Sequence, residues 1–341
     1  MIGYTFSAYL REFGKEYPYQ GEYDLRESLF TASLNDMLAH NELYDSGSVT
    51  FSKSINQFSD MTPEEVEGFY RGYRHTRKLG DVIWSVDNQN ITLKDVPTSY
   101  DWRDQGAITP VKNQESCGSC WAFASTETLE SHHFIKNSEL VVLAPQQLVD
   151  CTPNPDHCGG TGGCQGATAE LAYTYLQKSP SGLAQESDYP YKAVDGFCKD
   201  KKVTGAATVS SFKKLTENSY EDVLNTLATV GPIAVAVDAA SWSSYGGGIY
   251  TGCDTSENID IDHLVQLVGY GEDAGQKYWT VRNSWGEGWG ESGYIRLERH
   301  TEEYCGQDST PLDGSGCTGG PDVVKVCGTC GILYDTVIPV V

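Results

Sequence analysis

The stretch Gln114-Glu-Ser-Cys117-Gly118-Ser119-Cys120-Trp121-Ala-Phe123 marks the beginning of an amphipathic helical run over residues 119–136. Cys120 therefore lies at a predicted helix start. The unpaired N–H groups of a helix N-terminus stabilise a thiolate, which is the nucleophilic form of cysteine. Gly118 leaves room for a substrate backbone to come close. The stretch predicts a nucleophilic cysteine presented at the end of a helix.

A thiolate nucleophile needs a group that takes its proton and later protonates the leaving amine, and imidazole suits this near neutral pH. His263 lies at the start of a predicted strand. Asn283 follows another predicted strand, and its amide oxygen is suited to accept the ring N–H of His263. Trp285 would cover that hydrogen bond. The residues predict a Cys–His–Asn catalytic arrangement assembled from distant parts of the chain.

The chain divides into a helical prefix, a helical half and a β-rich half. Apolar residues between Glu22 and Asn41 recur with a helical period, and short β-branched and aromatic runs occupy residues 233–237, 264–270, 278–281 and 294–297. Residues 301–322 are predicted to form a long surface loop pinned by disulfides. His132 and His133 are predicted to lie on a solvated helix surface.

Charge and cysteine content exclude several classes of protein. The net charge of −23 over 341 residues argues against nucleic acid or an anionic membrane as a partner, because both bind basic patches. No apolar run approaches the roughly 18 residues of a membrane span. No signal peptide is evident, so a secretory chain would already have lost it. The 11 cysteines indicate disulfides and an oxidising compartment, and their odd number leaves a thiol over.

The cysteine pairs also suggest two other kinds of site. Cys117 and Cys120 have the spacing of a redox pair, and together with Cys327 and Cys330 they mimic a zinc ribbon. The two pairs lie roughly 200 residues apart, however, far beyond the spacing of a ribbon. We therefore expect no metal and no cofactor. Glycosylation at the Asn90 sequon is left open.

Further motifs accompany Cys-Gly-Ser-Cys-Trp along the chain: Asp101-Trp-Arg103, Pro110-Val-Lys-Asn-Gln114, Val268-Gly-Tyr-Gly271 and Trp285-Gly-Glu-Gly-Trp289. With them the chain resembles the cathepsin L-like peptidases of the papain family from about residue 96 to its end. The resemblance implies an α+β, papain-like fold with a helical lobe, a β-barrel-like lobe and a cleft between them. It also implies that Gln114 supplies an oxyanion-hole amide beside the backbone N–H of Cys120.

The prefix resembles the inhibitory propeptides of the same family. On one predicted helix, Glu22, Arg26, Phe30 and Asn41 match the propeptide pattern, whereas Ser33 and Met37 depart from it, and residues 54–60 resemble a second propeptide motif. The resemblance implies a mainly α-helical inhibitory propeptide over residues 1–95, with an extended, cleft-blocking segment at 81–95. The peptidase domain would then span residues 96–341.

The family pattern implies three disulfides, which are Cys117–Cys164, Cys151–Cys198 and Cys253–Cys330. The additional cysteines are even in number and suffice for two more bridges, whose pairing is left open: Cys158, Cys305, Cys317 and Cys327. Removal of these ten leaves Cys120, the residue that the chemistry needs unpaired.

Alignment on the family's C-terminal segment places Asp335 at the floor of the S2 pocket, which holds the P2 residue of a substrate. The same resemblance assigns further substrate contacts to Gly118, Gly166, Ala167, Thr168, Ala169, Ala236 and Ile261. Small apolar walls suit Leu or Phe at P2, and a carboxylate on the floor adds a partner for Arg or Lys. We expect a dual P2 preference.

The sequence thus predicts the zymogen of a cysteine endopeptidase that acts on proteins and peptides, works as a monomer and is inhibited by its own propeptide. It is expected in an acidic lysosome-like or vacuolar compartment or outside the cell. A thiol transpeptidase or ligase on the same fold remains an alternative, as does a non-catalytic binding protein.

Overall fold

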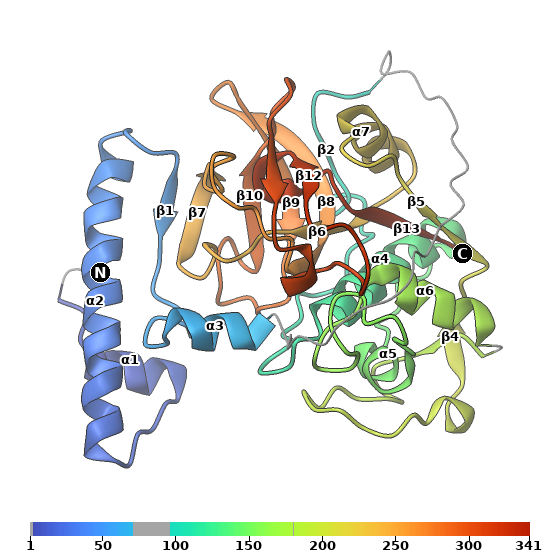
Figure 1. Ribbon diagram of the computed structural model, residues 1–341, viewed down its shortest axis with the longest axis horizontal. Coiled ribbons are helices and arrows are strands. Elements are labelled where there is room, and N and C mark those ends of the chain that lie inside the picture. Colours follow the sequence, from blue (N-terminus) through green and yellow to red (C-terminus); the bar gives the residue numbers. More distant parts are fainter. Residues whose placement is uncertain (1–2, 71–95, 180) are drawn as a thin grey trace.

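The computed structural model describes residues 3–70, 96–179 and 181–341. The predicted cleft-blocking segment, residues 81–95, and the Asn90 sequon lie outside these ranges. The helices are α1 (Phe6–Phe13), α2 (Gln20–Asp45), α3 (Pro63–Tyr70), α4 (Cys120–Asn137), α5 (Pro145–Cys151), α6 (Ala169–Lys178) and α7 (Tyr220–Thr229). In Figure 1, α1 and α2 lie at the left, most strands occupy the middle, and α4, α5 and α6 lie at the right.

Nine strands form the main sheet, in the order β1-β7-β10-β9-β8-β6-β13-β5, with β2 paired to β8. They are β1 (Phe51–Lys53), β2 (Tyr100–Asp101), β5 (Ser211–Lys214), β6 (Ile233–Val237), β7 (Tyr245–Tyr250), β8 (His263–Asp273), β9 (Gln276–Arg282), β10 (Tyr294–Glu298) and β13 (Thr336–Val340). Short pairs join β3 (Leu183–Ala184) to β4 (Gly205–Ala207) and β11 (Cys305–Asp308) to β12 (Val324–Cys327). The α+β prediction is confirmed, but the described strands follow an open path and close no barrel.

Helix α4 packs against β6, β8, α5 and α6. Its residues from Cys120 to His133 are all buried, so the amphipathic pattern expected for it is wrong. The residues of strand β6 explain why α4 can pack closely against the sheet. Its odd positions (Ile233, Val235 and Val237) enter the core of the β half, whereas the small Ala234 and Ala236 point toward α4.

The prediction of a solvated surface at His132 and His133 is also wrong. Both side chains are buried, and Nε2 of His132 donates to the carbonyl of Pro232 at 2.8 Å. Burial lowers the pKa of His132 to about 4, so the ring is neutral and serves as a hydrogen-bond donor between α4 and the start of β6.

Helix α2 confirms the helical period of the prefix, although only Phe30 and Met37 among its residues are buried. Leu25 is half exposed, and among the described elements α1 and β1 are the main ones that pack against this long helix. Asn41 ties α2 to β1, since its amide donates to the carbonyl of Lys53 and accepts from the N–H of the same residue, both at 2.8 Å. Within the described ranges, no helix combines the length and apolarity needed to cross a membrane.

The prefix docks on the rest of the chain as an edge strand. Strand β1 pairs antiparallel with β7, where Ser52 faces Gly247. The pairing is close because β7 carries three consecutive glycines: a methyl group on Gly246 would lie 2.9 Å from the carbonyl carbon of Lys53, whereas one on Gly247 would meet its nearest atom at 3.5 Å. Beyond β1, Asn56 donates to the carbonyl of Ser243 at 2.6 Å.

We predict that Gly246→Ala weakens the docking of the prefix by about 1–3 kcal/mol, because the new methyl group overpacks the β1–β7 contact. Gly247→Ala is the matched control and should have little effect. Amide hydrogen exchange of residues 51–53 in the intact chain measures the difference. Equal protection of these amides in both variants would show that the close contact does not hold the prefix in place.

Candidate active site

Cys120 is the first residue of α4, as the sequence predicts. Among the described residues it is the cysteine that forms no disulfide, and only 6% of its surface is exposed. As the first residue of α4 it belongs to the first helical turn, whose N–H groups have no acceptor within the helix. This position supplies the helix-terminus field that a thiolate needs once the group becomes accessible.

His263 is the first residue of β8 and lies next to Asn283, which follows β9. The ring Nε2 of His263 is 2.8 Å from Oδ1 of Asn283. The same Oδ1 also accepts the backbone N–H of Ser284 at 2.8 Å, which identifies the atom as oxygen. Nε2 therefore carries the proton, and the basic lone pair of the ring lies on Nδ1.

Aromatic side chains cover this pair. The rings of Trp285 and His263 lie 5.1 Å apart, and Trp242 approaches the imidazole edge-on at 6.4 Å. Trp289 packs against Trp285 at 5.0 Å. These rings keep water away from the His263–Asn283 hydrogen bond, as expected for Trp285 from the sequence.

Burial controls the charge of both candidate catalytic groups. It raises the pKa of the Cys120 thiol to about 12, in spite of the nearby backbone N–H groups. Burial also lowers the pKa of His263 to about 4, which its bond to Asn283 only partly offsets. At neutral pH the groups are therefore a thiol and a neutral imidazole, so the more reactive ion pair requires a change in their solvation.

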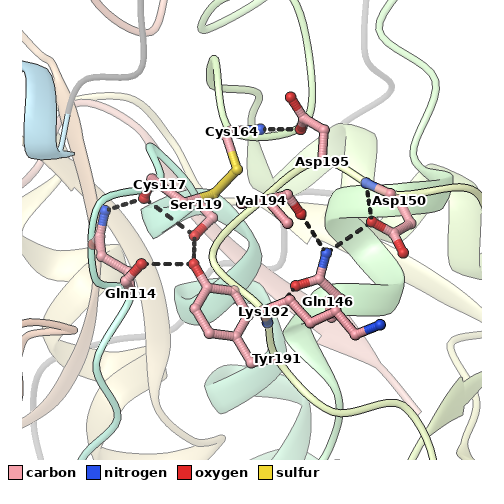
Figure 2. The surroundings of a disulfide bond; sticks show 12 residues. Gln114, Cys117, Ser119, Gln146, Asp150, Cys164, Tyr191, Lys192, Val194 and Asp195 are labelled. Atoms are coloured by element: carbon pink, nitrogen blue, oxygen red, sulfur yellow. Dashed lines mark hydrogen bonds between the residues drawn. A yellow bond between two sulfur atoms is a disulfide. The ribbon is translucent and has the colours of Figure 1, made fainter.

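Gln114 is fully buried and lies beside the start of α4 (Figure 2). Its side-chain amide donates one N–H to the carbonyl of Cys117 at 3.0 Å, and its Oε1 accepts from Ser284 Oγ at 2.6 Å. Tyr191 fixes the same region, because its hydroxyl donates to the carbonyl of Gln114 at 2.7 Å and contacts Ser119 Oγ at 2.6 Å. The amide is therefore held in one orientation.

The three disulfides that the family pattern implies are present, as are two more: Cys117–Cys164, Cys151–Cys198, Cys253–Cys330, Cys158–Cys317 and Cys305–Cys327. These pairings contradict both the redox-pair and the zinc-ribbon alternatives. The first disulfide ties the start of α4 to the segment before Gly166 (Figure 2).

Cys120 and His263 line one hollow of about 420 Å³, part of which is open to solvent. The predicted substrate contacts that line it with them are Gly166, Ala167, Thr168, Ala236 and Asp335. Three other predicted contacts lie outside this lining: Gly118 and Ala169 are buried beside it, and Ile261 is completely buried. The structure thus brings most, but not all, of the predicted S2 residues together.

Asp335 has a partner that the sequence did not indicate. Its carboxylate lies 3.1 Å from Nζ of Lys214 on β5, and the same ammonium group is 3.6 Å from Glu170. Desolvation and the charge of Asp335 raise the pKa of Glu170, whereas the Asp335 charge raises that of Lys214. The carboxylate of Asp335 in the lining of the hollow is therefore already paired with Lys214.

Sequence reasoning missed several residues that line the hollow, which are Gly159, Asp262, Leu264, Asp313, Gly314 and Ser315. Those at 313–315 belong to the segment predicted only as a surface loop. The two extra cysteines Cys158 and Cys317 were the signal that could have found them, because their disulfide joins this segment to the turn before Gly166.

Comparison with known families matches both parts of the chain. Residues 96–314 match the model of the papain family cysteine protease, and residues 6–66 match that of the cathepsin propeptide inhibitor domain. Digestive cysteine proteinase 1 of Homarus americanus is 39% identical over 302 residues, which cover 86% of this chain and 89% of that protein. Procathepsin L of Mus musculus is 38% identical over 292 residues, 84% of each chain.

Solved precursor structures have the same arrangement. The digestive procathepsin L2 proteinase from the larval midgut of Tenebrio molitor aligns with a TM-score of 0.78 at 33% identity, covering 98% of both chains. A recombinant stem bromelain precursor aligns with a TM-score of 0.77, also at 33% identity, covering 98% of this chain and 97% of that one.

Proposed function

The chain belongs to the papain family of cysteine proteases and is a cathepsin L-like protease in its precursor form, and on that premise we propose that it is an endopeptidase with Cys120 as nucleophile and His263 as base. One observation carries the proposal. The residue at the start of α4 and the residue at the start of β8 line the same hollow, while Asn283 orients the imidazole at 2.8 Å.

In the proposed reaction, the sulfur of Cys120 attacks the carbonyl carbon of a peptide bond after its proton passes to Nδ1 of His263. The C–N bond then breaks, and the imidazolium protonates the leaving amine. Water attacks the thioester with His263 as base, which releases the acid and restores the thiol. Asn283 keeps the ring in the required tautomer throughout.

Gln114 and the backbone N–H of Cys120 stabilise the oxyanion in this proposal. The carbonyl of Cys117 and the hydroxyl of Ser284 hold the Gln114 amide before substrate arrives, so it costs little reorganisation in the transition state. Such a preorganised donor contributes about 2.7–4 kcal/mol to transition-state stabilisation.

The prefix is an intramolecular inhibitor, and we place the end of the propeptide near residue 95. An ion pair inside the prefix makes it sensitive to acid: Arg26 contacts the carboxylate of Glu65 through two N–H groups at 2.5 and 2.7 Å. The Arg26 hydrogen bonds lower the pKa of Glu65. A carboxylate with a lowered folded-state pKa stabilises the fold above its unfolded pKa, and that contribution disappears as the pH falls through the folded value.

The S2 assignment supports a preference for Leu or Phe at P2 and, through Asp335, for Arg or Lys. The five disulfides favour an oxidising compartment, so we place the enzyme in an acidic vacuole or outside the cell, which localisation of the tagged chain would check.

Loss of the proposed nucleophile should abolish turnover. Cys120→Ala, freed of its prefix by a second protease, should hydrolyse no peptide while its circular dichroism matches that of the native enzyme. Turnover by pure Cys120→Ala would remove the assignment, and addition of an amine acceptor to the native enzyme distinguishes hydrolysis from transpeptidation by the products formed.

Gln114→Ala should retain activity but lose about 10²–10³-fold in kcat, because it removes one donor to the oxyanion.

Weakening of the Arg26–Glu65 pair should shift activation toward neutral pH. The precursor is expected to mature near pH 4–5, close to the ordinary pKa of carboxylates. Glu65→Gln lacks the ion pair at every pH, so its conversion to the shorter form, followed on gels across a pH series, should begin at higher pH. Glu64→Gln, on the exposed side of α3, is the control; identical profiles for both variants would refute the role of the pair.

The proposed contact between Asp335 and the P2 side chain is tested by replacing each partner of the Asp335–Lys214 ion pair in turn, since the two replacements should have opposite effects. Asp335→Ala should lower kcat/KM for P2-Arg substrates by about 10-fold, or about 1.4 kcal/mol, and spare P2-Leu substrates. Lys214→Met should raise kcat/KM for P2-Arg, because it removes the competing ammonium group. A parallel response of P2-Arg and P2-Leu substrates to these changes would show that Asp335 does not contact P2.

A further inference from the structure

A hairpin insertion crosses one end of the candidate cleft. Strands β11 and β12 pair antiparallel, with Cys305 opposite Cys327, and a disulfide joins these two residues at the base of the hairpin. The segment of residues 307–318, here called the strap, leaves β11 and runs from the β side of the cleft to the helical side. Hydrogen bonds attach it to both sides, with side chains taking part on the β side, and a disulfide adds a covalent link on the helical side.

On the β side, the strap is bonded to the segment that leads into His263. The N–H of Ile259 donates to the carbonyl of Gln307 at 3.0 Å, and the N–H of Ser315 donates to the carbonyl of Ile261 at 2.7 Å. A methyl group on Gly314 would lie 2.1 Å from the Ile261 carbonyl oxygen. The glycine therefore lets the strap lie directly on this wall.

On the helical side, the strap is bonded to the turn that leads into Gly166. The N–H of Gly159 donates to the carbonyl of Gly316 at 3.1 Å, and the N–H of Thr318 donates to the carbonyl of Asp156 at 3.1 Å. The Cys158–Cys317 disulfide makes this attachment covalent. The two walls are thus connected across the hollow by main chain that cannot swing away without breaking a disulfide or several hydrogen bonds.

The strap also forms part of the lining of the hollow. Asp313, Gly314 and Ser315 line the same space as Ala167 and Asp335. If the P2 side chain of a substrate enters this space, the substrate residues on the N-terminal side of P2 meet the strap.

We propose that the strap limits how many substrate residues can bind ahead of P2, so that this endopeptidase gains little from residues N-terminal to P2 and accepts longer chains only when they bend away beyond P2. This inference rests on the proposed peptidase function and on the S2 assignment. The strap is a steric determinant of specificity and has no part in bond cleavage.

The test measures kcat/KM of the mature enzyme on a series of peptides. All peptides share the same P2 and P1 residues and the same reporter group, and they differ only in having zero, one or two further residues on the N-terminal side of P2. The double variant Cys158→Ser/Cys317→Ser releases the strap from the helical wall. The matched control, Cys305→Ser/Cys327→Ser, also removes one disulfide of the hairpin but leaves that attachment intact. Labelling of Cys120 with an alkylating inhibitor normalises the concentration of active sites, and thermal melting verifies folding.

In the native enzyme and in the control, kcat/KM should differ little between long and short substrates. In the released variant, the ratio of kcat/KM for the long substrate to that for the short one should rise by about fivefold or more. A smaller gain, or an equal gain in the control, overturns the proposal. If the cysteine double variant does not fold, replacement of residues 309–317 by a short glycine linker is measured by the same ratio. Lack of peptidase activity in the native enzyme would instead refute the proposed function.

Discussion

The burial of α4 between the sheet and the other helices is the constraint on which the molecule depends. It places the first residue of a helix against the first residue of a strand from the other half of the chain. Polar groups on α4 make that burial possible: Glu127 lies 3.4 Å from the buried Arg282, and its carbonyl accepts the side-chain amide of Gln266 at 3.0 Å. Without such partners the polar residues of a fully buried helix would be strongly destabilising.

The same burial sets the protonation of the two candidate catalytic groups in the precursor. Cys120 and His263 are correctly supported, yet low solvation favours their neutral forms. The prefix contacts the rest of the chain near this site in two places. Strand β1 pairs with β7, and the side chain of Gln57 donates to the carbonyl of Trp285 at 2.9 Å. Trp285 follows Ser284, whose hydroxyl holds Gln114. A docking contact of the prefix and the hydrogen bond that holds Gln114 are therefore made by adjacent residues, Trp285 and Ser284.

Local sequence patterns predicted the helices and strands correctly where the residues of the segment itself determine its secondary structure. The β-branched runs became β6 and β8 to β10, and the helical run became α4, because backbone preference and tertiary packing agree there. They failed where a third element decides burial. His132 occupies a polar position on a helix, and only the approach of the Pro232 carbonyl converts it into a buried neutral donor.

The sequence by itself determined the family, the order of helical and β-rich parts and the candidate catalytic residues, since these depend on motifs whose chemistry is local. Only the tertiary structure decided the pairing of Cys158 with Cys317, the approach of Lys214 to Asp335 and the position of residues 313–315 in the hollow. Each of these is a contact between distant segments. Neither periodicity nor composition records such contacts, because they depend on how whole elements pack and not on the residues beside them in the chain.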